Sequence, residues 1–324
     1  MSRETYPKEE LESYRKVQAL AYEAVESVRK ELYPGITEKE AARKIDDYIR
    51  NAGGTSFFHY GFAWFGDRTA FRGFKRPLSL NYLRKGEGLL PHFGGKFQPS
   101  NRRLEEGMAV ILDVAPTFAG RAADVGYAFS FGKNPEHDKA LVNLEEYREL
   151  ILRRVLEERT LSEIYLEVDA RIRASGYVNC HSIYPQGVLG HKVGRLPAYN
   201  FPGGRVNGFP FQTFAYLFPQ MIKDLIPGVS GHSPLWGEGS DFRAEPGLWA
   251  VEPHIGKIYS GSKESESFGA KWEEILVVTD STAYWLDEDL PHVRLWKEKK
   301  KSKSSKPAAN SKANTKKQKE KVPA

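Results

Sequence analysis

The chain has 324 residues, a formal net charge of +6, and 40% hydrophobic and 12% aromatic residues. This length allows one large domain or two of ordinary size, with ample apolar material for a core. No stretch approaches the length of a membrane span, and the single cysteine, Cys180, excludes an intramolecular disulfide and a cysteine-cluster zinc site. With a polar N-terminus that lacks the apolar stretch of a secretory signal, these features predict a cytoplasmic globular protein.

The net charge is divided unevenly along the chain. Residues 297–324 hold eleven lysines and two glutamates, a net charge of +9, so the remainder carries −3. The Lys, Ser, Ala, Asn and Pro composition of this segment predicts disorder. We therefore expect a folded domain over 1–296 and a disordered basic tail over 297–324. The tail either makes weak, nonspecific contact with RNA or the ribosome through its charge, or is a solubilising extension.

Two helices are predicted at the start of the chain. Apolar residues recur at three- and four-residue spacing over 8–32, and Pro34 and Gly35 then end the pattern. Thr37 followed by Glu40 is a capping-box signature for a second helix, over 38–52.

The next segments are less regular. Residues 55–75 are aromatic and strand-like, and either supply an aromatic substrate wall or form a plain core strand. Further segments are predicted as follows: loop over 84–107, helices over 135–158 and 160–175, a long Gly/Pro-rich stretch over 184–247, and strands over 248–255 and 271–279. A stretch as long as 184–247 in a compact domain is functional or carries structure of its own.

A predicted hairpin, GMAVILDVAPTFAGRAADVGYAFSFG, carries one aspartate in each arm. If Asp113 and Asp124 face each other, the chain reverses after Phe118 and Leu112 pairs with Val125. One face of the hairpin is then apolar and the other holds both carboxylates, whose like charges repel at about 5 Å. A divalent metal between them is the expected resolution.

Three further residues could meet these aspartates. Alternation places Glu252 on the face of Ala250, and Glu273 on the apolar face of 271–279, while Glu274 falls on the opposite, solvated face. His191 lies among small residues in LGHKVG. Two aspartates, two glutamates and one histidine suit Mn²⁺, Co²⁺, Fe²⁺ or Zn²⁺.

Each of these residues also has an ordinary interpretation. A single carboxylate near a strand end is usually a surface residue, a histidine beside glycines is usually structural, and Glu273 could pair with an arginine. The combination of the five favours a metal site.

The order and spacing of these residues resemble the M24-type dimetal metallopeptidases, the family of methionine aminopeptidase, aminopeptidase P and prolidase. The matching strings are LYPGITEKEAARKI, ILDVAP, the hairpin's D-x₄-F-x-F-G, GHKVG, EPGLWAVEP and EEILVVT. The resemblance implies the α+β pita-bread fold, a curved antiparallel sheet with flanking helices.

The resemblance also implies roles for individual residues. Asp113 would bind one metal ion, Asp124 and Glu273 would bridge two, and His191 and Glu252 would bind the other. Glu252 would in addition transfer a proton. His92, in LLPHFGG, is similar to a family histidine that contacts substrate near the scissile bond, as a catalytic and substrate-binding residue.

The chain departs from the family at one position of the substrate site. The family has a second histidine seven residues after the metal-binding one, and here that position is Ala198, preceded by Pro197. His232 could replace it in substrate binding from the long Gly/Pro-rich stretch. For His181 and His254 a structural role is favoured.

The resemblance implies an aminopeptidase that removes an N-terminal residue from peptides with a dimetal-activated water. Its specificity is expected to be Xaa-Pro-like or general, because the departures weaken a methionine pocket. The alternatives are a binding protein that keeps the fold without catalysis, and a related C–N hydrolase for a small non-peptide substrate. A homodimer is a further expectation.

Overall fold

The computed structural model describes residues 6–54, 56–74, 96–196, 205–221 and 231–304. Helices cover antiparallel sheets, and every strand pair in the described residues is antiparallel. The expected α+β class, with antiparallel sheet and flanking helices, is therefore confirmed.

The helices lie mostly in the first half of the chain and at its end. They are α1 (Lys8–Glu31), α2 (Glu38–Asn51), α4 (Pro135–Asn143), α5 (Glu145–Leu156), α6 (Leu161–Ala174), α7 (Phe211–Met221) and α8 (Pro291–Ser304). The strands are β1 (Ser56–Phe65), β2 (Ala109–Phe118), β3 (Arg121–Ala122), β4 (Val125–Ser130), β5 (Val178–Asn179), β6 (Val188–Val193), β7 (Arg205–Val206), β8 (Phe209–Pro210), β9 (Leu235–Gly237), β10 (Gly247–Val251), β11 (His254–Lys257), β12 (Phe268–Lys271), β13 (Glu274–Val278) and β14 (Ala283–Trp285).

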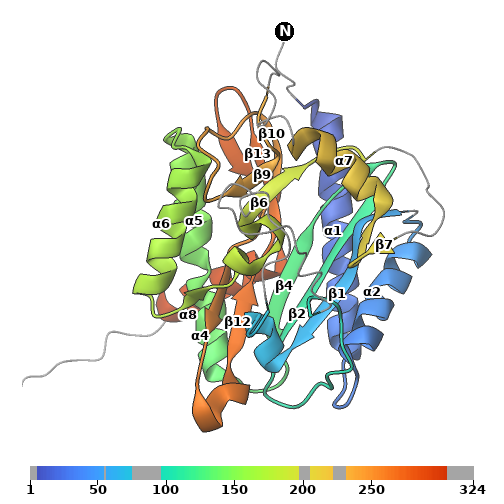
Figure 1. The fold of residues 1–324 in the computed structure, drawn as a ribbon, viewed down its shortest axis with the longest axis vertical. Helices are drawn as coiled ribbons and strands as arrows, with labels where there is room; N and C mark the ends of the chain where they lie inside the picture. Colours follow the sequence, from blue (N-terminus) through green and yellow to red (C-terminus); the bar gives the residue numbers. More distant parts are fainter. Residues whose placement is uncertain (1–5, 55, 75–95, 197–204, 222–230, 305–324) are drawn as a thin grey trace, which may run out of the picture.

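Within the described ranges, the strands form two main sheets and two smaller ones. In the first main sheet β2 lies between β1 and the β3–β4 arm, and the second has the order β14-β13-β10-β6-β9. A three-stranded sheet, β12-β11-β5, continues from the second (Figure 1). An isolated bridge between Tyr127 and Trp272 joins β4 to the β12–β13 segment. Helices α1 and α2 lie along one side of the strands, and α5 and α6 along the other (Figure 1).

The predicted helices are largely confirmed. The first two match α1 and α2, and Thr37 and Glu40 form the reciprocal capping box that begins α2. The single helix predicted over 135–158 is wrong, because the chain breaks at Leu144 into α4 and α5. The long stretch 184–247 does contain structure, including β6, α7 and β9.

The two C-terminal strand predictions each span a break. The segment 248–255 divides into β10 and β11 around Glu252 and Pro253, and 271–279 divides into β12 and β13 around Glu273. Val251 pairs with Glu274 before the break and His254 pairs with Lys271 after it. Continuing this register places Glu252 opposite Glu273, where the chain passes from one sheet to the next.

The hairpin register differs from the prediction by two residues. Asp113 pairs with Gly126 rather than Asp124, and Phe118 pairs with Arg121. The chain reverses at Ala119 and Gly120, whose φ values of 48° and 79° suit a tight two-residue turn. A slip of two residues preserves the face of every side chain, so both aspartates still lie on one face.

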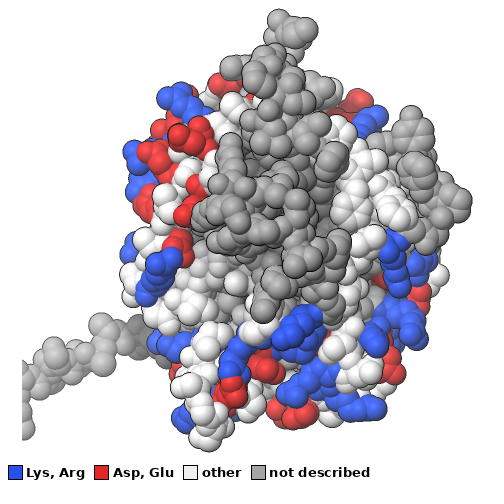
Figure 2. All heavy atoms as spheres, viewed as in Figure 1, with Lys and Arg blue, Asp and Glu red and all other residues white. Residues whose placement is uncertain are grey.

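The basic C-terminal segment is partly helical. Helix α8 continues to Ser304, so residues 297–304, which we expected to be disordered, are helical. Residues 305–324 lie outside the described residues. Within the described residues, no helix is long and apolar enough to cross a membrane. Figure 2 shows acidic and basic side chains interspersed over the described part of one face.

Candidate metal centre

Two groups of buried residues could each hold a metal ion, and they share Asp124. One group is His59, Asp113 and Asp124, and the other is Asp124, His191 and Glu273. Within each group the ligand atoms lie within 4.8 Å of one another. All five side chains are less than a tenth exposed. The structure therefore brings together four of the five residues that the sequence singled out, and adds His59.

The backbone is irregular at most of these positions. Asp124 lies between β3 and β4, and Glu252 and Glu273 lie in the breaks between strands. On β1, Phe57 pairs with Pro116 and His59 pairs with Ala115, so Phe58 is an extra residue in the ladder. Bulges and strand breaks free side chains from strict alternation and often lie beside active sites. Asp124, Glu252, Glu273 and His59 thus converge from segments that do not follow regular strand geometry, whereas Asp113 lies within β2.

Each carboxylate oxygen of Asp124 contacts one histidine. His59 Nε2 lies 2.9 Å from Oδ1, and His191 Nε2 lies 3.3 Å from Oδ2. The other ring nitrogen of each histidine donates to a backbone carbonyl, that of Tyr60 for His59 and that of Lys192 for His191. An imidazole held by such a bond at Nδ1 presents Nε2 to the site, which is the arrangement of metal-binding histidines.

Lys271 supplies a positive charge inside the cluster. Its Nζ donates to Asp113 Oδ2 at 2.7 Å and to Glu252 and Glu273 at 3.0 Å each. The lysine is 2% exposed, and Nζ also lies 5.1 Å from the centre of the Tyr184 ring. Lys271 therefore joins Glu252 to the cluster and compensates part of its charge.

The pKa shifts of these residues reflect an excess of negative over positive charge in the cluster. Burial raises the pKa of Glu273 well above its usual value, and the charges of Asp124 and Glu252 raise it further against the effect of Lys271. Burial also raises the pKa of Glu252, against Lys271 and His191. Burial opposes the charge on His59, but Asp124 and Asp113 outweigh it and raise the pKa of His59 to about 9. The site thus holds four buried carboxylates, and the positive charges nearby compensate only part of their negative charge.

This donor set fits divalent metal ions. Donor atoms that bind one ion at about 2.1 Å lie about 3.0 to 3.4 Å apart in octahedral or tetrahedral geometry. The Asp124–histidine separations of 2.9 and 3.3 Å agree with these values. Carboxylate oxygens and imidazole nitrogens suit Mn, Fe, Co and Zn.

The other predicted site residues do not join the cluster. His92, Pro197 and Ala198 lie outside the described residues. His232 is exposed, and its ring stacks on that of Phe242 with centroids 4.2 Å apart. His254 is fully buried, with Nε2 2.7 Å from the Thr69 carbonyl oxygen and Nδ1 3.0 Å from the Tyr184 hydroxyl, as expected of a structural histidine.

The expectation that Glu274 is solvated is wrong. Its side chain is 0% exposed and accepts hydrogen bonds from Arg148, and His292 Nε2 lies 3.0 Å from it. Burial would raise its pKa, but His292 and Arg148 together lower it. Alternation placed Glu274 on the opposite face from Glu273 correctly, and helix α5, which carries Arg148, covers that face.

Sequence reasoning missed two residues of the cluster. Lys271 lies two residues before Glu273, so strand alternation was a signal that the two share a face. His59 had no comparable signal, because it stands alone among aromatic residues and its approach depends on the bulge at Phe58.

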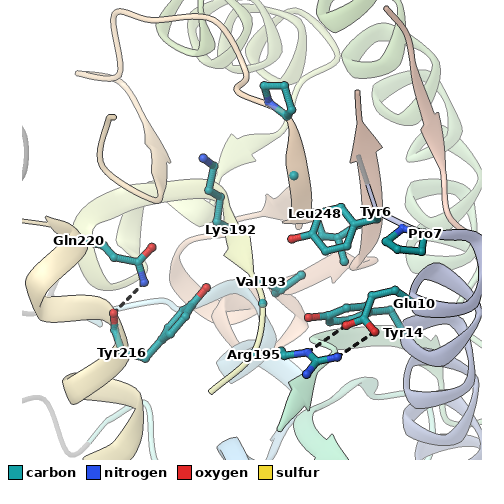
Figure 3. Close-up of a pocket in the computed structure, with 13 residues that line it drawn as sticks. Tyr6, Pro7, Glu10, Tyr14, Lys192, Val193, Arg195, Tyr216, Gln220 and Leu248 are labelled. Atoms are coloured by element: carbon teal, nitrogen blue, oxygen red, sulfur yellow. Dashed lines mark hydrogen bonds and ion pairs between the residues drawn. The ribbon is translucent and has the colours of Figure 1, made fainter. Parts of the chain in front are cut away.

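The described residues also line a partly open cavity of about 480 Å³ beside the end of β6 (Figure 3). Its walls come from the start of α1, the end of β6, α7 and the start of β10, and they do not include the clustered carboxylates. Tyr216 lines this cavity and packs edge-on against Phe58, whose ring stacks on His191 at 5.2 Å. Contacts between aromatic rings therefore link the lining of this cavity to His191.

Structural comparison shows which folds this arrangement resembles. A dipeptidase from Pyrococcus horikoshii matches with a TM-score of 0.57 and 17% identity, over 86% of this chain and 60% of its own. An X-Pro aminopeptidase from Thermotoga maritima matches with a TM-score of 0.57 and 18% identity, over 88% and 62%. A methionine aminopeptidase from Thermotoga maritima matches with a TM-score of 0.50 and 16% identity, over 88% and 99%.

These identities establish the fold alone, which is the expected pita-bread fold. The chain spans about 60% of the length of the first two of these proteins. No curated protein matches the sequence. The sequence profile of metallopeptidase family M24, however, matches residues 12–280, which is most of the chain. The protein therefore belongs to metallopeptidase family M24.

Proposed function

We propose that this protein is a metal-dependent aminopeptidase that removes one N-terminal residue from peptides. The observation that carries the proposal is the buried cluster in which Asp113, Asp124, His191 and Glu273 meet around a shared carboxylate. A surplus of buried carboxylates is costly unless cations compensate it, and two divalent ions would do so.

The proposed assignments follow the resemblance to the family. Asp113 would hold one ion, Asp124 and Glu273 would be shared by both, and His191 and Glu252 would hold the other; the grouping of Asp124 with Asp113 and with His191 and Glu273 supports them. Bound divalent ions lower the pKa of a water molecule and polarise a carbonyl group. The metal is one of Mn, Co, Fe or Zn.

The remaining residues have roles of their own. We assign to the Glu252 carboxylate the transfer of a proton to the leaving amine, because it lies at the edge of the cluster and is 8% exposed. Lys271 positions Asp113, Glu252 and Glu273 by donating to all three. His92 and His232 are the candidates for substrate contact, and the ring of His232 stacks on that of Phe242.

We propose Xaa-Pro-like or general specificity rather than methionine specificity. The support is in the sequence, where Ala198 and Pro197 replace residues of the family's substrate site. A peptide substrate, a cytoplasmic location and a homodimer belong to the same proposal, and the tail's contact with RNA or the ribosome is its weakest part.

The test is product analysis by mass spectrometry with Met-Xaa, Xaa-Pro and unrelated dipeptides and tripeptides, each with Mn²⁺, Co²⁺, Fe²⁺ and Zn²⁺. From each tripeptide we expect one free N-terminal amino acid and the remaining dipeptide, and from each dipeptide both free amino acids. The matched control is the same peptide with an acetylated N-terminus, which should remain intact. Asp124→Ala should abolish activity and metal binding together, and full metal stoichiometry in that variant would show the site to be misassigned.

One observation favours a second candidate, a binding protein without catalysis. The Lys271 ammonium already contacts three carboxylates, which partly compensates the cluster when no metal is present. Absence of bound metal after reconstitution with all four ions, together with no turnover, would favour this candidate. Turnover of a small C–N substrate without release of amino acids would instead indicate the related hydrolase.

A further inference from the structure

We propose that His59 is an additional metal ligand, which gives the Asp113 side of the centre a nitrogen donor. This inference rests on the proposed function, because it concerns the same pair of ions. In the assignment above, His191 is the sole histidine and belongs to the other ion. With His59, each ion has one imidazole.

The first argument is position. His59 Nε2 lies 2.9 Å from Asp124 Oδ1 and 3.3 Å from Asp113 Oδ1. The two oxygens belong to the two aspartates assigned to this ion. The separation from Asp113 falls within the range of about 3.0 to 3.4 Å for donors that share one ion, and the separation from Asp124 is just below it. The ring is buried at 5% exposure, so its orientation is held by the protein.

The second argument is the equivalence of the two histidines. His59 and His191 each direct Nε2 at a different oxygen of Asp124, and each donates Nδ1–H to the carbonyl of the following residue. The carboxylate that is assigned to bridge two ions thus has one imidazole beside each of its oxygens.

The third argument is the backbone that presents His59. The β1 ladder is irregular on both sides of this residue, between Phe57 and His59 and between His59 and Phe62. In the β2 register, Asp124 falls opposite Ala115, which is also the partner of His59. The small Ala115 side chain separates His59 and Asp124 and lets the imidazole reach across β2. Bulges of this kind direct a side chain toward a site at the expense of ladder hydrogen bonds.

A simpler interpretation is that His59 is an imidazolium that pairs with Asp124 and takes no part in metal binding. The two interpretations predict opposite effects of removing the ring. Loss of a ligand weakens binding of the ion, whereas loss of a positive charge beside the carboxylates strengthens it.

The experiment measures metal content and dissociation constants of the full chain, by equilibrium dialysis against Co²⁺, Zn²⁺ or Mn²⁺ and elemental analysis. We expect the wild type to bind two ions. His59→Ala should retain one ion and bind the second at least about 100-fold more weakly. Because imidazole prefers Co²⁺ and Zn²⁺ over Mn²⁺, the loss should be larger for Co²⁺ and Zn²⁺. His137→Ala, which removes another buried histidine, is the matched control and should bind two ions as the wild type does.

Two further readouts distinguish ligation from a structural effect. X-ray absorption of the wild type loaded with two equivalents of Zn²⁺ should show an average of one imidazole per ion, and half that value would mean that His191 alone ligates. In His59→Gly, added imidazole should restore binding of the second ion.

Unchanged or tighter binding of the second ion in His59→Ala would overturn the proposal. So would a wild type that binds one ion with no effect of His59→Ala. A wild type that binds no metal would overturn both this inference and the proposed function, whereas loss of the second ion without loss of the first in His59→Ala supports both.

Discussion

Glu273 and Glu274 are neighbours in the chain, and both are buried, with 1% and 0% exposure. Glu274 faces Arg148 and His292, and these partners lower its pKa. Glu273 faces a site where burial and three other carboxylates raise its pKa. Proteins normally pair a buried charge with an opposite one. We call the surroundings of Glu274 the balanced side, which is structural. The surroundings of Glu273 are the unbalanced side, where added cations would bind.

The largest expected effect comes from removing the charge on the unbalanced side. Glu273→Gln should lower kcat/KM by on the order of 10³-fold or more, because metal ions contribute several kcal/mol to transition-state stabilisation. The free energy of unfolding of the metal-free protein should stay the same or increase, since a repulsive charge is lost. Peptide hydrolysis with metal present measures kcat/KM. Denaturant titration in the presence of a chelator measures the free energy of unfolding. An activity near that of the wild type would contradict the role of Glu273.

A substitution of Lys271 tests whether its ammonium group stabilises the unbalanced side. Lys271→Met should lower the free energy of unfolding of the metal-free protein by about 3–5 kcal/mol, because it leaves three buried carboxylates without this partner. Metal at 100 times its dissociation constant should return about 2.7 kcal/mol. Lys192→Met, which breaks the more exposed pair with Glu245, is the control and should cost about 1 kcal/mol or less. A metal-free Lys271→Met protein as stable as the wild type would refute this role.

Glu274→Gln probes the balanced side. It should lower the free energy of unfolding by about 3 kcal/mol, because Arg148 and His292 lose a buried partner. The affinity for metal should be that of the wild type. Denaturant titration and metal dialysis on the same preparation test both statements, and loss of metal binding would mean that the two sides are not independent.

The smallest expected effect concerns a buried histidine that belongs to neither side. His137 contacts the Ser130 hydroxyl and the Gly269 carbonyl, and burial lowers its pKa from 6.5 to about 4. Below pH 6.5 the unfolded chain binds a proton that the folded protein does not take up until about pH 4, so stability falls as the pH drops through this range.

His137→Gln should therefore lose less stability than the wild type between pH 7 and pH 5, by about 2 kcal/mol. Comparing two pH values in each variant removes any constant effect of the substitution. Identical pH dependence in His137→Gln and the wild type would contradict the prediction.

Sequence alone predicted the fold class through the resemblance to the M24 family, and it predicted the shared face of the two hairpin aspartates through strand alternation. The hairpin shows why the prediction of a shared face holds although the predicted register is wrong. The turn at Ala119 and Gly120 shifts the register by two residues, and an even shift keeps Asp113 and Asp124 on one face.

The residues that sequence could not place depend on contacts between distant segments. The burial of Glu274 requires Arg148, which lies 126 residues away on α5. The approach of His59 to Asp124 requires an extra residue in β1, and no local pattern in an aromatic strand indicates where such a bulge lies. The break at Leu144 is likewise set by packing, since Leu144 is buried and its carbonyl accepts a hydrogen bond from the indole of Trp272.

Trp272 lies in the chain between Lys271 and Glu273 and is fully buried. Its indole stacks on His292 with ring centres 5.6 Å apart, so it contacts the balanced side while its neighbours on both sides belong to the candidate metal centre. The emission of a buried indole responds to charges near its ring. The chain therefore carries an intrinsic fluorophore at the boundary between the two clusters, and its emission offers a label-free optical signal for events at either one.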